Sequence, residues 1–261
     1  MKKVIFAAVA VICILLVTSQ PILALSDTPH SFYCIRNKEH KQPRLGAELE
    51  FIDNYSSYYV DKKHGDNSNE KVVYLTFDAG YENGNIEKIL NVLKEEDVKG
   101  AFFILKNLIE KNPELVMRMS DEGHTVGNHT SRHKDMTKID DIKTFEEELG
   151  ELNRIYEKVT GKKMSNYYRP PEGKFDERSL SYAIELGYKT IFWSFAYADW
   201  DNNNQPNADE AKKKIFDNIH NGAVILLHPT SATNAQILSD VIKELKEQGY
   251  RFGELSELCG Q

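Results

Sequence analysis

Five short segments of the chain carry side chains suited to proton transfer and metal binding. They are TFDAG with Asp78, NHTSRH with His129 and His133, RPPEG beginning at Arg169, WSFAYADW with Asp199, and ILLH ending in His228. A carboxylate can take a proton from water, two imidazoles can share a divalent cation, and a histidine beside an aspartate can donate a proton. Each motif alone is ambiguous, because an aspartate after a strand often only caps a turn. Their meaning therefore depends on whether the fold brings them together.

The elements that must position these motifs begin at Lys71, where short apolar segments start to alternate with longer amphipathic ones. Runs rich in Val, Ile, Phe and Tyr predict strands at 72–77, 100–105, 125–128, 167–169, 190–194, 223–227 and 251–255. Apolar residues at helical spacing predict helices at 85–96, 114–121, 142–159, 177–186, 208–219 and 235–248.

This alternation predicts an α/β fold with parallel strands and right-handed crossovers. We expect a distorted (β/α) barrel, complete or incomplete, with a doubly wound open sheet as the alternative. Each of the five motifs lies at the end of a predicted strand. Since parallel strands direct their carboxyl ends to one edge, the motif residues should gather around one site.

Composition excludes several other classes of protein. The chain has 261 residues, of which 41% are hydrophobic and 28% charged, with 15 Gly, 8 Pro and 3 Cys. These values are typical of a globular protein and not of collagen, a disordered chain or a disulfide-rich miniprotein. The 33 Lys and Arg residues are outnumbered by 40 Asp and Glu residues, giving a net charge of −7. This balance argues against a nucleic-acid partner, and we expect a monomer.

The N-terminal region predicts export. Lys2 and Lys3 precede an uninterrupted apolar run at 4–17, and Pro21 follows it. This pattern is typical of a signal peptide covering residues 1–26, and an uncleaved membrane anchor is the alternative. Residues 27–70 are polar and predict an N-terminal extension that wraps or tethers the catalytic domain, residues 71–261. Either form of the N-terminus would place the catalytic domain outside the cytoplasm.

Two cysteines of the mature chain and several histidines lie outside the motifs. Cys34 and Cys259 lie near opposite ends of the mature chain, and outside the cytoplasm they could form a disulfide or remain two free thiols. The histidines that lie in polar segments are expected to be exposed: His30, His40, His64 and His220.

In their order and spacing, the five motifs resemble those of the polysaccharide deacetylases, carbohydrate esterase family 4, with its NodB homology domain. The likeness extends from about Lys71 to the C-terminus. The extended sequence TFDAGYENGN, and Ala196 in WSFAYADW, are similar to the spore-cortex branch of the family. That branch removes the acetyl group from N-acetylmuramic acid before muramic δ-lactam forms.

The resemblance implies catalytic roles for these residues. His129 and His133 would bind one divalent metal ion, and Asp78 would act as general base. Arg169 would keep Asp78 ionised and correctly oriented. His228 would be the general acid, with Asp199 raising its pKa so that it stays protonated near neutral pH.

Further residues would contact the substrate. Because Pro170 and Pro171 have no N–H, Glu172 carries the first backbone donor after its strand, and the resemblance implies that this N–H stabilises the oxyanion. The remaining expected contacts are Trp200 and Leu226 as an apolar wall, with Trp200 alternatively a core residue, and Tyr81 beside the base.

One position departs from the family pattern. Most members have TFDDG, in which the second aspartate binds the metal, whereas this chain has Ala79. A methyl group cannot bind a cation, so we expect a weakly held ion, with zinc favoured over manganese, cobalt or magnesium. Glu82, Asn83 and Asn128 are candidates for a replacement ligand.

The resemblance implies a metal-dependent de-N-acetylase whose partner is a peptidoglycan strand with its stem peptides removed. A deacetylase of N-acetylglucosamine in peptidoglycan or chitin oligosaccharides, or an acetyl xylan esterase, is the alternative enzyme. Ala79 also leaves open a catalytically weak wall-binding protein.

Overall fold

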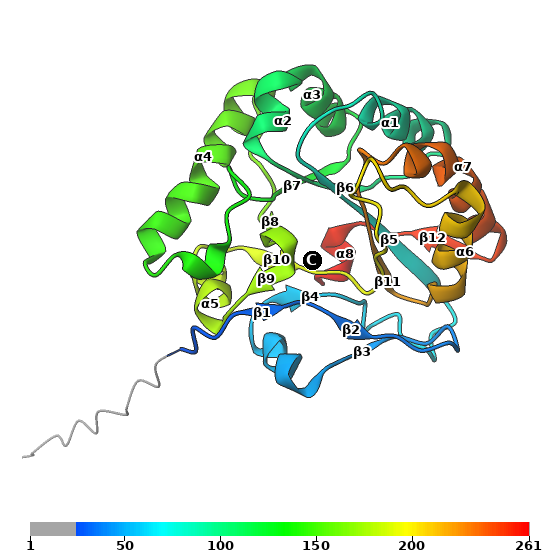
Figure 1. The fold of residues 1–261 in the computed structure, drawn as a ribbon, viewed down its shortest axis with the longest axis horizontal. Coiled ribbons are helices and arrows are strands. Elements are labelled where there is room, and N and C mark those ends of the chain that lie inside the picture. Colours follow the sequence, from blue (N-terminus) through cyan, green and yellow to red (C-terminus); the bar gives the residue numbers. More distant parts are fainter. Residues whose placement is uncertain (1–24, 261) are drawn as a thin grey trace, which may run out of the picture.

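The computed structural model describes residues 25–260, and the largest sheet in that range has eight strands (Figure 1). Seven follow the order β11-β5-β6-β7-β8-β10-β4, and β12 pairs with β5. Their bounds are β4 (Ser57–Tyr58), β5 (Lys71–Ala79), β6 (Ala101–Ile104), β7 (Thr125–Asn128), β8 (Tyr167–Tyr168), β10 (Lys189–Ile191), β11 (Ala223–Leu227) and β12 (Tyr250–Phe252). Every pairing in the sheet is parallel. The α/β prediction is confirmed.

The sheet curls into a distorted barrel instead of remaining open. Single bridges link its far side to β11, from Val60, which follows β4, to Ala223 and from Phe195, which follows β10, to Ile225. Figure 1 shows most of the helices outside the curled sheet. Their bounds are α1 (Ile86–Glu95), α2 (Lys106–Lys111), α3 (Pro113–Asp121), α4 (Ile142–Thr160), α5 (Glu177–Glu185), α6 (Ala208–Asn218), α7 (Ala232–Glu247) and α8 (Leu255–Leu258).

Six of the eight helices in the described range lie where amphipathic spacing predicted them, because each buries one apolar face, whereas the short helices α2 and α8 were not predicted. The α1 face comprises Ile86, Ile89, Leu90 and Leu93, all fully buried. Helix α7 begins three residues before its predicted start. The Ser231 side chain accepts the N–H of Asn234 and thereby caps the first turn.

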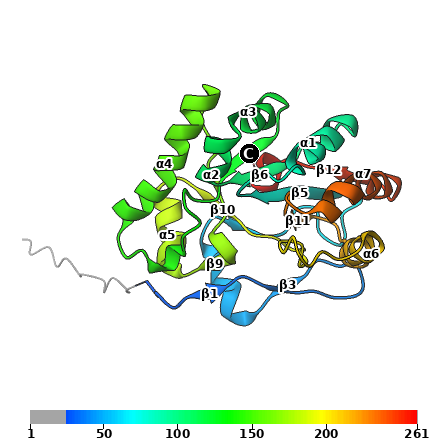
Figure 2. The same cartoon turned by 45° about the horizontal axis from the view of Figure 1, so that its top comes forward.

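The segment before β5 packs along one side of the barrel, where Figures 1 and 2 draw it in blue. It contains β1 (His30–Ser31), the β2–β3 hairpin (Cys34–Ile35 and Arg44–Leu45) and the 3₁₀ helix η1 (Ala47–Asn54), and it ends in β4. Strand β1 pairs antiparallel with β9 (Lys174–Phe175), while β4 extends the main sheet beside β10. The segment contributes Phe32, Leu49 and Ile52 to an apolar cluster that it shares with Phe175 and Phe192.

The predicted export segment lies almost wholly outside the described residues. Within the described range, no helix is both long and apolar enough to cross a membrane.

The expectation that the histidines in polar segments are exposed holds for His40, whereas His30 is half-buried and the other two are buried. His64 and His220 are buried because each has a buried polar partner. The Nδ1 atom of His64 lies 2.6 Å from Asp61 Oδ2, and the Nε2 atom of His220 lies 2.9 Å from Ser194 Oγ. These partners come from tertiary packing, which the polarity of the local sequence does not reveal.

Cys34 and Cys259 are free thiols in the structure, so the disulfide alternative is not supported. The Cys34 thiol donates to the carbonyl oxygen of Ser194. Burial raises the pKa of Cys34 to about 11 and that of Cys259 to about 12. Both thiols are therefore protonated and weakly nucleophilic near neutral pH.

Candidate active site

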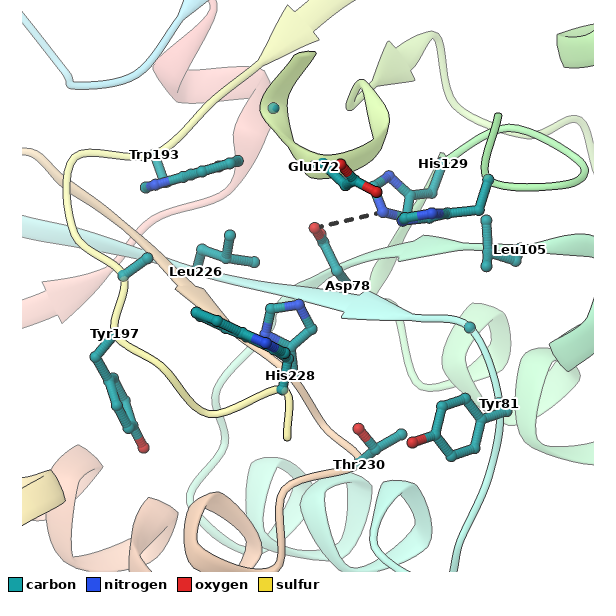
Figure 3. A pocket seen from close by; sticks show the side chains of 15 residues that line it. Asp78, Tyr81, Leu105, His129, Glu172, Trp193, Tyr197, Leu226, His228 and Thr230 are labelled. Atoms are coloured by element: carbon teal, nitrogen blue, oxygen red, sulfur yellow. Dashed lines mark ion pairs between the residues drawn. The ribbon is translucent and has the colours of Figure 1, made fainter. Parts of the chain in front are cut away.

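A cavity of about 640 Å³ lies at the carboxyl ends of the sheet strands (Figure 3). Its lining includes Asp78 from β5, His129 after β7, Glu172 after β8, Trp193 after β10 and His228 after β11. The structure thus places residues from five separate motifs around one cavity. Parallel strand direction explains this convergence, because every loop that follows a strand leaves the sheet at the same edge.

Asp78 is held by a buried arginine. Its Oδ1 atom accepts a 2.8 Å bond from Arg169 Nη1, and its side chain is 9% exposed. Burial by itself raises the pKa of Asp78, but the positive charge of Arg169 outweighs this effect, so the pKa lies below its ordinary value. Asp78 is therefore a carboxylate near neutral pH, and its second oxygen, Oδ2, lies 3.5 Å from His129 Nε2.

Arg169 is fully buried, and each of its three side-chain nitrogens donates at least one hydrogen bond. Its Nε donates to the carbonyl of Ile191 at 2.9 Å, and Nη2 donates to Thr76 Oγ1 at 2.9 Å and to the carbonyl of Phe192 at 3.1 Å. The guanidinium carbon lies 4.2 Å from the centre of the Phe103 ring. These contacts fix the guanidinium and, through it, the direction of Asp78.

His129 presents one nitrogen to Asp78 and the other to the backbone. The carbonyl of Arg169 lies 2.8 Å from His129 Nδ1, and since a carbonyl only accepts, Nδ1 carries the hydrogen. Nε2 therefore has a free lone pair, 3.5 Å from Asp78 Oδ2 (dashed line in Figure 3). Burial lowers the pKa of His129 to about 4, which keeps the imidazole neutral.

His133 lies beside His129, with 5.1 Å between the ring centres. The loop that connects them has positive φ at Thr130, 73°, and at His133, 55°. Side chains hold this conformation, since Asn128 Oδ1 accepts the N–H of Thr130, and Thr130 Oγ1 accepts the N–H of His133. Both imidazoles therefore line the cavity.

Two imidazoles beside a carboxylate suit a divalent cation, and the free lone pair of His129 is the form that a metal ligand requires. A complete ligand set is not present: in the part of the chain that the structure describes, no group of three or more His, Cys, Asp or Glu could hold a metal ion. Ala79 is fully buried in the main apolar cluster.

The three proposed replacements for the missing ligand are engaged elsewhere. The Glu82 carboxylate accepts the N–H groups of Gly84 and Ile86 at the start of α1. Asn83 donates to the carbonyl of Thr230, and Asn128 donates to the carbonyl of Leu149 and accepts from Thr130. None of the three lines the described cavity, so proximity in sequence was a poor guide to a ligand.

His228 is bound twice by Asp199. The backbone N–H of His228 donates to Asp199 Oδ2 at 2.8 Å, and its Nδ1 lies 2.7 Å from Asp199 Oδ1. Burial by itself lowers the pKa of His228, but the hydrogen bond and charge of Asp199 outweigh it and raise the pKa above its ordinary value. Sequence reasoning missed Asn234, whose amide donates to Asp199 Oδ2 at 2.6 Å from the first turn of α7.

The other predicted contact residues lie on the cavity lining. Trp200 is 61% exposed with its ring 6.3 Å from that of His228, which excludes the alternative that Trp200 packs in the core. Leu226 forms part of the floor, Tyr81 accepts a bond from the Asn202 amide, and Glu172 has a positive φ of 56°. Trp193 also lines the cavity. The sequence did not predict this contact, although Trp193 is the first residue of the WSFAYADW motif.

Comparison with known proteins agrees with this geometry. The polysaccharide deacetylase family model matches residues 65–191. The peptidoglycan-N-acetylmuramic acid deacetylase PdaA of Bacillus subtilis is 41% identical over 236 residues, which cover 90% of this chain and 88% of the relative. The chain belongs to the polysaccharide deacetylases, carbohydrate esterase family 4, and is an enzyme of that class.

Two further similarities extend the comparison. The solved structure of Bacillus subtilis PdaA, a family 4 carbohydrate esterase, has a TM-score of 0.84 at 40% identity, covering 90% of this chain and 98% of that one. The predicted barrel fold is thereby confirmed. A peptidoglycan-N-acetylglucosamine deacetylase of Bacillus cereus is 31% identical over 73% of this chain and 89% of its own length.

Proposed function

We propose that this deacetylase removes the N-acetyl group from N-acetylmuramic acid residues in peptidoglycan strands whose stem peptides are gone, a step towards the muramic δ-lactam of spore cortex. One observation supports amide hydrolysis as the reaction. The buried, ionised carboxylate of Asp78 and the imidazole of His228, which is hydrogen-bonded to Asp199, line the same cavity. The choice of muramic acid rests on the similarity to PdaA, which extends over 90% of this chain.

In the proposed reaction, Asp78 takes a proton from the attacking water, since Arg169 keeps it ionised. The backbone N–H of Glu172 donates to the oxygen that becomes negative when the acetyl carbon turns tetrahedral. His228 gives its proton to the sugar nitrogen as the C–N bond breaks, and Asp199 keeps that proton available. Acetate and a free amino sugar leave, which accounts for all atoms of the amide and one water.

His129 and His133 are the residues that would hold a divalent metal ion, zinc being the favoured one. When bound, such an ion acidifies water and polarises the acetyl carbonyl. The hydrogen bond from His129 Nδ1 to the Arg169 carbonyl orients the imidazole for this task.

Metal binding should be weak and reversible, because the protein offers two imidazole ligands and Ala79 has no atom that can bind a metal ion. We expect zinc affinity in the micromolar range, loss of the metal on dialysis against EDTA, and recovery of activity when zinc is restored. His133→Ala should abolish measurable zinc binding while folding normally, since His133 is exposed. Calorimetric titration of the metal-free protein measures both affinities. Sub-nanomolar retention by the wild type, or unchanged binding by His133→Ala, contradicts this ligand set.

Activity should fall when the pH rises through the pKa of His228, because the general acid must be protonated. That pKa is raised by Asp199, whereas burial alone would lower it. Asp199→Asn should therefore move the alkaline limb of the kcat profile to lower pH. The rate should fall more at about pH 8 than at about pH 6. Asp201→Asn, which removes an exposed charge nearby, is the control, and an unmoved limb in Asp199→Asn refutes the assignment.

Peptidoglycan with and without stem peptides, and chitin oligomers, separate the candidate substrates. After incubation with the wild type, muramidase digestion and mass spectrometry locate the sugar that has lost an acetyl group. We expect the loss on muramic acid in the peptide-stripped strand. Loss on glucosamine or from chitin favours the second candidate, which the similarity to the Bacillus cereus enzyme supports. Glycan binding without acetate release favours a wall-binding role.

We also propose a domain organisation and a cellular location for the protein. Residues 1–26 would direct export, residues 27–70 would form the extension, and residues 71–261 would form the catalytic domain. A peptidoglycan substrate requires action outside the cytoplasm, in the cell wall or spore envelope, and we propose that the protein acts there as a monomer.

A further inference from the structure

The N-terminal extension packs directly behind the turn that carries Glu172. Strand β1 pairs antiparallel with β9, which follows this turn, through the pairs His30–Phe175 and Ser31–Lys174. Phe32 continues the contact, since its backbone N–H donates to the carbonyl of Gly173 at 2.8 Å. A segment more than a hundred residues away in sequence thus bonds to a residue of the cavity lining.

The Phe32 side chain wedges between two parts of the site. Its ring stacks on Phe192 with 4.3 Å between centres and an interplanar angle of 12°. It also meets Trp193 edge-on, with centres 5.5 Å apart and an angle of 71°. Phe192 accepts a hydrogen bond from Arg169 through its carbonyl, while Trp193 and Gly173 line the cavity. The Phe32 ring therefore contacts both Phe192, whose carbonyl binds Arg169, and Trp193, which forms part of the cavity wall.

Two backbone hydrogen bonds lie within the turn, from the Gly173 N–H to the Pro170 carbonyl at 3.1 Å and from the Lys174 N–H to the Pro171 carbonyl, and neither of them uses the Glu172 N–H. Pro170 and Pro171 have no N–H to donate. Glu172 and Gly173 both have left-handed backbones, with φ of 56° and 64°, and this conformation is strained for a residue with a side chain. The Glu172 side chain is 59% exposed, and its ion partner Lys174 is on the surface beside it. Such strained conformations persist when surrounding packing enforces them.

The space behind the turn is filled. A methyl group placed on the Cα of Gly173 would lie 2.8 Å from the Trp193 ring and 3.3 Å from Phe32 Cβ. The turn therefore packs tightly against these two side chains, which prevent it from moving away from the cavity. Shortening Phe32 would open the space into which Gly173 and Trp193 could relax, and the Glu172 N–H would move with them.

We propose that Phe32, in the N-terminal extension, is a positioning residue for deacetylation: it holds the 170–173 turn and Trp193 so that the Glu172 N–H meets the developing oxyanion. This inference rests on the proposed function. A misplaced oxyanion donor weakens binding of the transition state and leaves binding of the ground-state substrate largely unchanged. The deficit should therefore appear in kcat and not in KM.

The test compares Phe32→Ala with Leu49→Ala. Leu49 belongs to the same apolar cluster and is just as buried, but it does not line the cavity. Both truncations should destabilise the protein, as urea unfolding would measure. Phe32→Ala should lower kcat about 10-fold to 100-fold on peptide-stripped peptidoglycan, with KM within about twofold of wild type. Leu49→Ala should keep the wild-type kcat, and Phe32→Leu should recover most of the loss.

A spectroscopic measurement tests the same contact without turnover. In a Trp200→Phe background, Trp193 is the remaining tryptophan of the chain, so the near-ultraviolet circular dichroism of its indole reports on that side chain. Phe32→Ala should reduce this signal, whereas Leu49→Ala should preserve it.

Equal kcat values for Phe32→Ala and Leu49→Ala, or an unchanged indole signal in Phe32→Ala, overturn the proposal. If Phe32→Ala does not fold, Phe32→Val takes its place and is compared with Leu49→Val by the same criteria. A wild type that releases no acetate contradicts the proposed function instead, and the indole signal then still decides whether Phe32 holds Trp193.

Discussion

Asp78→Asn should lose about 10³-fold or more in deacetylation rate while keeping its fold and its glycan binding. The amide keeps the size of the carboxylate, and its oxygen can still accept from Arg169, but it cannot take a proton from water. Removal of a general base typically costs about 10²-fold to 10⁴-fold. Acetate release from peptide-stripped peptidoglycan measures the loss, and sedimentation with insoluble glycan measures the binding.

The control must account for the buried ion pair that this substitution breaks. Leaving a buried charge such as Arg169 without its partner can cost about 3–5 kcal/mol of unfolding free energy. Asp61→Asn is a matched variant, because Asp61 is also a buried aspartate, paired with His64 and Tyr74 away from the cavity. We expect Asp61→Asn to be destabilised but active at temperatures where it is folded. Substantial activity in Asp78→Asn, or equal loss in both variants, contradicts the role of Asp78 as base.

His228→Ala should lose about 10²-fold to 10⁴-fold in activity on the amide substrate, because the departing sugar nitrogen then has no positioned proton donor. The effect should depend on the leaving group. An aryl acetate such as p-nitrophenyl acetate releases a stable phenolate that needs no proton. His228→Ala should therefore keep much more of the wild-type rate on this ester than on the glycan.

This dependence on the leaving group separates the two roles. Asp78→Asn should lose activity on both substrates, since both reactions need an activated water. A His228→Gln variant, which retains a polar group near Asp199 but has no titratable proton, should behave like His228→Ala. If His228→Ala loses the ester and the amide activities to the same extent, His228 does not act as the general acid for the leaving group.

Local sequence patterns predicted the strands that are buried on both faces. Strands β7 and β11 have the predicted bounds. In β11 the reason is a continuous apolar segment, Ala223–Leu227, which suits a parallel sheet that is covered on both faces. Strand β4 was not predicted. Its two residues, Ser57 and Tyr58, are extended because they pair with β10, and this pairing cannot be read from the local sequence. Helix α2 was missed because six residues are too few to establish a helical period.

The sequence likewise predicted only part of the site. Asp78, His129 and His228 could be placed together from sequence because each lies at the carboxyl end of a parallel strand, and strand direction fixes the edge at which it ends. Asn234 and Phe32 were missed because each acts through a neighbour that is distant along the chain. Asn234 bonds to Asp199, and Phe32 packs on Phe192 and Trp193. Local residue spacing carries no record of such contacts.

The sequence by itself determined the residue types, their order and the edge of the sheet at which they meet, since alternating periodicity and strand direction are local properties of the chain. The tertiary structure decided which groups bond to one another. It turned Glu82, Asn83 and Asn128 away from the cavity, buried Arg169 against Asp78, and set the N-terminal extension behind the Glu172 turn. These outcomes depend on loop paths and side-chain packing across distant segments, where many arrangements satisfy the same local pattern and long-range contacts select one.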